Sequence, residues 1–491
     1  MTIKRSLVIT LLFITAFIPR LYKINNPIAD WHSWRQADTA AVTRNFIKEG
    51  LTPLYPKFDS YYSLNEVGKP NPNRYFFAEF PLYNLVTYPF YKYLGVNEMY
   101  ARLVSVFFSS LTAVFIYLLA RRFSSERAAV LAGLVFAVLP FSIYYGRVIM
   151  PDPLHIFLSV LALYLVSLWT SKNTYFMTAL AGLATTGALL TKPYALVLGL
   201  PIIYLLLRKW GMKLFKKPEF YLYISLSLLP FLFWRWHISN YPEGMFGTSW
   251  LFNQGNIRFK GSFFRWIIFD RMNRLIFATG GFVLFWLGII RGRTKKEGWF
   301  YYLWLLAVAI FITVIAKGNV THDYYQMPLL PIGAIFIAKG FEFLMMYGSG
   351  IKQRLINFSL ALFLFAIMLA FGWYETRGFF NVNHPEIVEA GKAVDRLLPP
   401  DAKVIAPYMT DSAFLYQTNR YGWTLGGGLI PRFIEEGATH LVSTNFDDDT
   451  NFWMERCEVI VKTDSWVIIN VQNCKNETEP EKTLAPEEFY M

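Results

Sequence analysis

Four carboxylates stand in short polar segments between long apolar stretches of this chain. Asp38 lies within the run WRQADT at residues 34–39, and Asp30 lies just before this run. Glu79 precedes Phe-Pro, and Asp152 stands between two prolines. Carboxylates near hydrocarbon are costly and therefore mark functional cavities. A positioned carboxylate can accept the proton of an attacking hydroxyl in a group transfer. We therefore take these four as candidate catalytic residues, with Asp38 the first choice for a general base and Asp30 the second.

Each candidate also has a structural interpretation. Asp30 can cap the helix expected after it, and Asp38 can pair with Arg35, which shares a helical face with it at a spacing of three. Asp152 can cap the following helix, because the flanking prolines stop either helix from extending through it. Glu79 can be a solvated loop residue. The sequence leaves these alternatives open.

Cations and polar rings accompany the carboxylates in the same short segments. Lys192 stands alone between two apolar runs, where a snorkelling lysine is the alternative interpretation. Several loops that deliver such groups to one rim suit a phosphate carried at the bilayer surface. The candidate phosphate-binding residues are Arg35, Arg147, Lys192, His322 and Tyr325.

The composition indicates the kind of element that positions these groups. Of the 491 residues, 54% are hydrophobic and only 16% charged, whereas soluble chains carry about 25% charged residues. The net charge of +13 is unevenly divided, with +22 in residues 1–374 and −9 in residues 375–491. The sequence therefore predicts a membrane domain in 1–374 and a soluble domain in 375–491, and we expect membrane lipids and no nucleic acid as partners.

Repeated apolar runs are long enough to cross a bilayer as helices. We predict an all-α polytopic bundle of about eleven transmembrane helices, followed by a small C-terminal α/β domain. The predicted spans cover about residues 6–22, 100–120, 128–145, 153–170, 175–190, 193–208, 220–237, 275–290, 299–316, 325–346 and 355–374.

Basic residues in the short loops predict the orientation of the bundle. Loops such as 208–217 and 291–296 are rich in Lys and Arg, which favours the cytoplasmic side. We expect a multi-pass protein of the plasma (inner) membrane with a cytoplasmic N-terminus. The large first loop 23–99 and the domain 375–491 then lie on the exterior or periplasmic side.

The exterior segments carry recognisable local patterns. Residues 36–48 have helical spacing, and the aromatic stretch 80–94 is expected along the interface. In the tail, strands are expected near 402–406 and 440–443, helices over 411–419 and 431–436, and a hairpin formed by 457–462 and 466–471.

The two cysteines fall in this hairpin. Its register opposes Cys457 and Cys474, and an exterior compartment allows a disulfide to persist. A redox or metal site is the alternative, but no third ligand lies nearby in the sequence. We predict a disulfide between them.

The span plan, the large first loop and the exterior tail resemble the GT-C membrane glycosyltransferases, and within them glycosyltransferase family 39, which includes protein O-mannosyltransferases and the lipid A aminoarabinose transferase. The resemblance covers about residues 1–374, in a bacterial branch. Its motifs are WRQADTA at 34–40 with RNF at 44–46, EFPLY at 79–83, the stretch 147–152, and HDYY at 322–325 with Pro328 and Pro331.

Two positions depart from the family pattern. The usual Asp-Glu pair of the first loop falls on Arg35 and Gln36, so either Asp30 or Asp38 supplies the base or the pair has been replaced functionally. Glu79 is followed by Phe80 instead of the family's phosphate-binding Lys. Arg35, Lys192 or Arg147 can take over that role.

The resemblance implies a transferase that uses a polyprenyl-phosphate-linked sugar and an exterior acceptor, which is a glycan, a lipid or a protein. A single displacement would invert the anomeric centre. A divalent metal ion held by Glu79 and a neighbour is allowed but not required. The alternatives are a lipid-sugar transporter or flippase and a non-catalytic assembly protein.

Overall fold

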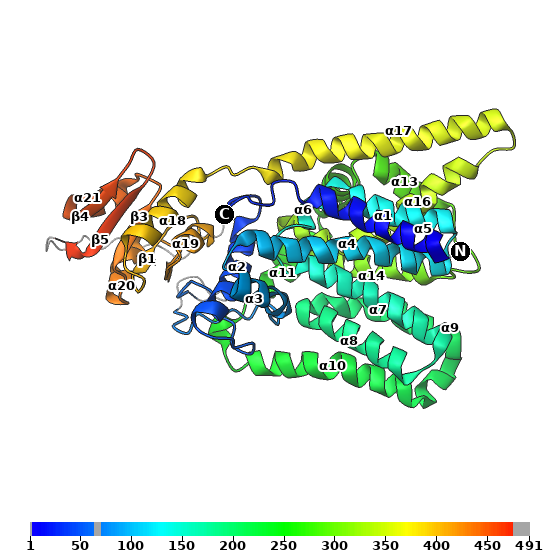
Figure 1. Cartoon of the computed structure of the whole chain (residues 1–491), viewed down its shortest axis with the longest axis horizontal. Helices are drawn as coiled ribbons and strands as arrows, with labels where there is room; N and C mark the ends of the chain where they lie inside the picture. The colour runs from blue at the N-terminus through cyan, green and yellow to red at the C-terminus, as the bar shows by residue number, and fades with distance from the viewer. Residues whose placement is uncertain (1, 63–69, 475–491) are drawn as a thin grey trace.

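The apolar stretches form the helices of a bundle in the computed structural model, which describes residues 2–62 and 70–474. In Figure 1 the bundle lies to one side, and the C-terminal domain lies at the end away from the N-terminus. The longer helices of the bundle are α1 (Thr2–Arg20), α4 (Glu98–Phe123), α5 (Glu126–Val138), α7 (Asp152–Lys172), α8 (Tyr175–Thr191), α9 (Gly199–Trp210), α10 (Pro218–Ile238), α13 (Gly280–Ile290), α14 (Phe300–Val314), α16 (Leu329–Met346) and α17 (Ile351–Thr376).

Shorter elements connect these helices. They are α6 (Pro140–Tyr145), η1 (Pro193–Leu198), η2 (Gly211–Lys216), η3 (Pro242–Gly244), α11 (Ser249–Asn253), η4 (Gln254–Phe259), α12 (Gly261–Phe264), the π-helix η5 (Arg265–Ile276), α15 (Ala316–Thr321), η6 (Asp323–Gln326) and η7 (Arg377–Phe380). Several of them lie at the end of the bundle that faces the tail.

Helices occupy all eleven predicted spans, although several are short. Among the described residues, five helical stretches are long and apolar enough to cross a membrane, and a sixth is added if the pair 261–276 and 280–290, bent by 114°, is one span. The bundle and the small C-terminal sheet confirm the predicted fold class. That all eleven helices cross the membrane stays a prediction.

Close backbone contact joins α13 and α16. A Cβ placed on Gly288 would lie 1.9 Å from the Phe336 carbonyl oxygen, and one on Gly340 would lie 1.9 Å from that of Leu284. Small residues allow such an approach between membrane helices, where van der Waals packing replaces the hydrophobic effect. These two glycines therefore fix the spacing of the two helices.

The large first loop contains two helices, and its helical spacing predicts the first of them. They are α2 (Ser33–Lys48) and α3 (Leu82–Leu94), and nearly every residue of α2 is buried. In Figure 1 both lie between the bundle and the C-terminal domain. The burial of α2 on all sides is typical of a helix enclosed between two other parts of a protein.

The tail folds around a five-stranded sheet of order β2-β1-β3-β5-β4. The parallel strands β2, β1 and β3 are joined by antiparallel β5 and β4. The elements are α18 (Pro385–Leu397), β1 (Lys403–Ile405), α19 (Ala413–Gln417), β2 (Tyr421–Trp423), η8 (Gly427–Leu429), α20 (Ile430–Glu435), β3 (His440–Ser443), α21 (Asp448–Arg456), β4 (Cys457–Lys462) and β5 (Val467–Cys474). The sequence analysis missed α18, β2 and α21. The predicted domain extends to residue 491, beyond the described residues.

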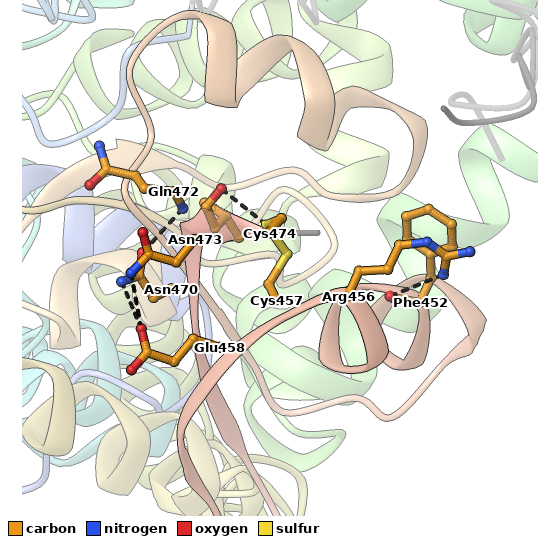
Figure 2. Close-up of a disulfide and its surroundings, with 9 residues drawn as sticks. Phe452, Arg456, Cys457, Glu458, Asn470, Gln472, Asn473 and Cys474 are labelled. Carbon is orange, nitrogen blue, oxygen red and sulfur yellow. Dashed lines mark hydrogen bonds between the residues drawn. A yellow bond between two sulfur atoms is a disulfide. The ribbon is translucent and has the colours of Figure 1, made fainter. Parts of the chain in front are cut away.

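The hairpin register brings the two cysteines together. Cys457 and Cys474 are Cα partners in the β4–β5 ladder, 4.0 Å apart, and form a disulfide (Figure 2). Beside it, Glu458 accepts hydrogen bonds from Asn470 and Asn473, each at 3.2 Å. The disulfide links the end of β5 to the start of the neighbouring strand β4.

The tail is attached to the first loop by backbone and side-chain bonds. Tyr61 donates its N–H to the Gly422 carbonyl at 2.9 Å, and Gly422 donates to the Asp59 carbonyl at 3.1 Å. The loop thus lies along the free edge of β2. On the other side, the Arg44 guanidinium of α2 lies 4.0 Å over the Tyr416 ring of α19. The tail and the first loop form one continuous structure.

Candidate functional site

Three separate segments bring their charges together around Lys192. The Lys192 ammonium lies 3.6 Å from an oxygen of Glu79 and 3.6 Å from Oδ2 of Asp152. The other Glu79 oxygen accepts a hydrogen bond from the Arg35 guanidinium at 2.5 Å. We name Arg35, Glu79, Asp152 and Lys192 the Lys192 cluster. Glu79 and Asp152 therefore share one site, because each lies 3.6 Å from the same ammonium.

Local structure fixes each member of the cluster. Arg35 lies in the first turn of α2, and Asp152 is the first residue of α7, where Pro151 and Pro153 set the start of the helix. Lys192 is the residue at which α8 ends and η1 begins. The segment after Glu79 is held in place because the Phe80 N–H donates to a backbone carbonyl at the end of α8.

Two of the structural interpretations do not apply here. The N-cap of α7 is Pro151, and the Asp152 side chain instead faces Lys192 and the Tyr194 hydroxyl, which donates to it at 3.4 Å. Glu79 is only 9% exposed. Neither carboxylate is a solvated or capping group.

The cluster contains buried hydrogen-bonding atoms with no partner in the described part of the chain. They are Nη1 of Arg35 and Oδ2 of Asp152, which faces Lys192 beyond hydrogen-bond distance. Buried polar atoms are nearly always bonded. Such open capacity is typical of a position that a ligand or water completes.

A stack of rings borders the cluster. His322 lies with its ring centroid 5.4 Å from that of Tyr324 and 5.9 Å from that of Tyr325, in nearly parallel planes. Burial, with a contribution from His32, lowers the pKa of His322 to about 4. At neutral pH His322 is therefore uncharged and can offer a ring N–H but no positive charge to a phosphate.

Asp30 and Arg147 form a different site. Asp30 accepts hydrogen bonds from Arg147 at 2.7 Å and from Gln36 at 2.6 Å, and Arg102 lies 3.8 Å away. Both the Asp30 and the Arg147 side chain are fully buried. The charges of Asp30 and Arg147 thus balance one another, which argues against Asp30 as a base and against Arg147 as a phosphate ligand. The capping interpretation of Asp30 is wrong, because the N-cap of α2 is His32.

Asp323 is a buried carboxylate that accepts several hydrogen bonds, and the sequence analysis did not select it as a site residue. It accepts hydrogen bonds from the His32 ring at 2.7 Å, from the Trp31 indole at 3.1 Å and from the Tyr145 hydroxyl. Burial alone would raise its pKa, but these bonds and Arg271 lower it. The only signal in the sequence is its position in the stretch 322–325. Asp323 fixes the start of α2 beside the Lys192 cluster.

Asp38 faces a cavity and not the Lys192 ammonium. It lies one turn after Arg35 on α2, and the cavity has a volume of about 190 Å³. Burial raises the pKa of Asp38 to about 7, although the Ser412 hydroxyl and the Arg35 guanidinium both lower it. Arg35 favours the ionised carboxylate, but the effect of burial on the pKa is larger. The Asp38 carboxyl titrates near neutral pH.

The donor set around Glu79 does not fit a divalent ion. Its two oxygens face Arg35 and Lys192, and cations repel a metal from the same lone pairs. Within residues 2–62 and 70–474, no three His, Cys, Asp or Glu side chains are placed to hold a metal. We derive no step that uses a metal ion.

One protein family matches part of the chain. Residues 79–236, which contain Glu79, Asp152 and Lys192, match the family described as dolichyl-phosphate-mannose-protein mannosyltransferase. No curated protein sequence matches the chain. The family match covers the middle of the bundle and leaves the tail outside it.

The fold has relatives of known structure. ArnT from Cupriavidus metallidurans bound to undecaprenyl phosphate is 14% identical, with a TM-score of 0.65 over 94% of this chain and 97% of that one. The oligosaccharyltransferase of Archaeoglobus fulgidus in its apo form is 11% identical, with a TM-score of 0.57 over 90% of this chain and 69% of that one. The archaeal oligosaccharyltransferase AglB from the same organism, in complex with an inhibitory peptide and a dolichol-phosphate, has a TM-score of 0.55 at 11% identity, with the same coverage.

These matches confirm the resemblance to the GT-C superfamily: the chain has the fold of the GT-C membrane glycosyltransferases. Within that class, residues 79–236 carry the sequence pattern of the dolichyl-phosphate-mannose-protein mannosyltransferases.

Proposed function

We propose that the protein transfers a sugar from a polyprenyl-phosphate donor to an acceptor on the exterior side of the membrane. The observation that carries the proposal is the Lys192 cluster, in which Arg35 and Lys192 come together from distant segments and Arg35 keeps one buried guanidinium nitrogen without a partner among the described residues. Undecaprenyl phosphate in the ArnT structure and dolichol-phosphate in the AglB structure support a lipid phosphate as the donor group. The site residues are assigned here from geometry.

Arg35 and Lys192 would bind the phosphate of the donor. Cations aimed at a departing phosphate stabilise the negative charge that develops on it. Glu79 and Asp152 hold the two cations in position, and their charges balance the cations while no phosphate is bound. Tyr325 and the neutral ring of His322 border the same space and add hydrogen-bond donors.

Asp38 would act as the general base. The acceptor oxygen forms a bond to the anomeric carbon while the bond from that carbon to the phosphate oxygen breaks. The acceptor proton passes to the Asp38 carboxylate, and the bonding electron pair leaves with the polyprenyl phosphate. One displacement inverts the anomeric centre. A pKa near 7 suits this role, because a base works best when its pKa lies near the working pH.

The membrane placement is part of the proposal. With the N-terminus in the cytoplasm, α2, the Lys192 cluster and the tail lie on the exterior side of the plasma membrane. Nucleotide sugars are not available there, so a lipid must carry the activated sugar. Residues 1–374 would hold the donor, and residues 375–491 would complete the exterior surface around Asp38.

The test uses the full chain purified in detergent with synthetic undecaprenyl-phosphate sugars. Lys192→Met should weaken binding of undecaprenyl phosphate by tenfold or more, because one phosphate partner is lost. Lys172→Met is the matched control, since Lys172 is exposed at the other end of α7. Equal phosphate affinity in both variants would refute the phosphate role. Lipid binding and translocation without transfer to any acceptor would favour the transporter instead.

A further inference from the structure

The cavity that Asp38 faces lies between α2 and the tail, beside the Lys192 cluster. We name it the α2–tail pocket. One wall comes from the first loop and the segment before α11, and the other comes from the tail. The residues that line it are Trp34, Asp38, Phe58, Ser60, Tyr62, Phe246, Thr410, Ser412, Thr424 and Leu425.

The lining combines aromatic rings with hydroxyl groups. Trp34, Phe58, Tyr62 and Phe246 supply ring surfaces, and two serines and two threonines supply hydroxyls. Ligand pockets are mainly apolar with a few placed polar groups. A sugar ring requires both kinds of surface, because its C–H face packs on aromatic rings while its hydroxyls need hydrogen-bond partners.

The charge of the pocket selects against an anion. No Lys or Arg is among the residues described as lining it, and its one ionisable acid is Asp38. A phosphate or an acidic peptide would face this carboxylate without compensation. The ligand that fits is therefore neutral and hydroxylated.

The size of the pocket indicates how much ligand it takes. A cavity of about 150 Å³ holds one six-membered ring such as benzene. The volume of about 190 Å³ here admits one ring with its substituents.

One hydroxyl that lines the pocket has no hydrogen-bond partner among the described residues. The Tyr62 hydroxyl is buried and makes no hydrogen bond within the described residues, although its ring is packed 5.2 Å from that of Phe433. An unbonded buried hydroxyl costs stability. A hydroxyl on a bound sugar would satisfy it.

The pocket is connected to the donor site through two residues. Phe246 lines the pocket, and its ring centroid lies 6.0 Å from the Arg35 guanidinium carbon. Asp38 lies one turn after Arg35 on the same helix. A hydroxyl bound at Asp38 is thus adjacent to the cations that would receive the departing phosphate.

We propose that the α2–tail pocket binds a neutral sugar ring of the acceptor, so that the acceptor is a glycan and the tail supplies half of its site. This inference rests on the proposed transferase function. It assigns to the tail a role in acceptor recognition.

The experiment uses the full chain in a detergent without a sugar headgroup, with octyl glycosides of several neutral hexoses as acceptor probes. Tyr62→Phe removes only the unbonded hydroxyl and should raise the acceptor KM by about three- to tenfold. Thr424→Phe fills the pocket and should abolish saturation-transfer NMR signals from the glycosides. Tyr61→Phe is the control, because the Tyr61 ring packs 5.2 Å from that of Trp423 and is not among the residues that line the pocket. Binding of undecaprenyl phosphate reports that each variant is folded.

The outcomes separate the two proposals. In one outcome, the protein transfers sugar to glycosides while neither Tyr62→Phe nor Thr424→Phe changes the acceptor KM. This result would overturn the pocket assignment and leave the transferase function intact. Glycoside binding that Thr424→Phe abolishes, in a protein that transfers no sugar, would support the pocket and overturn the transferase function. If no glycoside binds and the protein instead transfers the sugar to a peptide or a lipid phosphate, the inference is overturned.

Discussion

Replacement of Asp38 by Asn should abolish transfer and at the same time stabilise the protein above neutral pH. The pKa of this carboxyl rises from its ordinary value of 3.8 to about 7 in the folded chain because it is buried. Asn keeps the shape and hydrogen bonding of Asp38 but cannot accept the acceptor proton. Donor binding should survive, because Arg35 and Lys192 remain.

The stability effect follows from linkage. Because the folded pKa is raised, the folded state holds the proton more tightly than the unfolded state. The resulting stability is complete below about pH 3.8 and is lost as the pH rises through 7. A shift of about three pKa units corresponds to about 4 kcal/mol. Asp38→Asn removes this loss and should gain up to about 4 kcal/mol at pH 8, and far less at pH 4.

Thermal unfolding in detergent at pH 4 and pH 8, together with the transfer assay, measures both effects. Asp401→Asn is the control, because Asp401 is exposed on the tail. Turnover retained in Asp38→Asn would refute its role as the base. A variant no more stable than the wild type at pH 8 would refute the raised pKa.

Three further predictions concern the surroundings of the site. Ser412→Ala removes a hydroxyl that lowers the pKa of Asp38, so the acidic limb of the kcat/KM profile should move to higher pH; an unmoved limb would show that this hydroxyl, which donates to the Trp34 carbonyl at 3.0 Å, does not act on Asp38. Asp30→Asn leaves Arg147 buried without its counter-charge and should cost about 3–5 kcal/mol of unfolding free energy while the pH profile stays in place; a shifted profile would instead make Asp30 the base. Cys457→Ser opens a bridge of sequence separation 17 and should cost about 3 kcal/mol, measured by denaturant unfolding of the tail; equal stability would show that the sheet alone holds β4.

Long-range contacts explain what the sequence could and could not predict. Apolar runs specify helices locally, so all eleven segments and α2 follow from spacing alone. The partner of Glu79 cannot be predicted from spacing. The nearest cation along the chain, Arg74, pairs with Glu49, and Glu79 pairs with Arg35 from another segment. Only the fold brings Glu79 and Arg35 together.

The roles of the two aspartates near α2 show the same limit. Local spacing places Asp38 one turn after Arg35, but the pKa of Asp38 depends on its burial in a cavity that the tail residues Ser412 and Thr424 also line. Asp30 looks like a cap from its position, yet Arg147 arrives from a distant turn and binds it. In both cases an element remote in sequence decides the chemistry.

The shared walls of the α2–tail pocket have a consequence for how the protein is made. Its two sides, at Asp38 and Thr424, are separated by about 390 residues of chain. At a synthesis rate of about 5–20 residues per second, they leave the ribosome about 20–80 s apart. All four residues of the Lys192 cluster are translated well before the second wall exists. A nascent chain can therefore assemble the Lys192 cluster while it still lacks the proposed acceptor pocket, so the proposed transfer could begin only after the tail has been made.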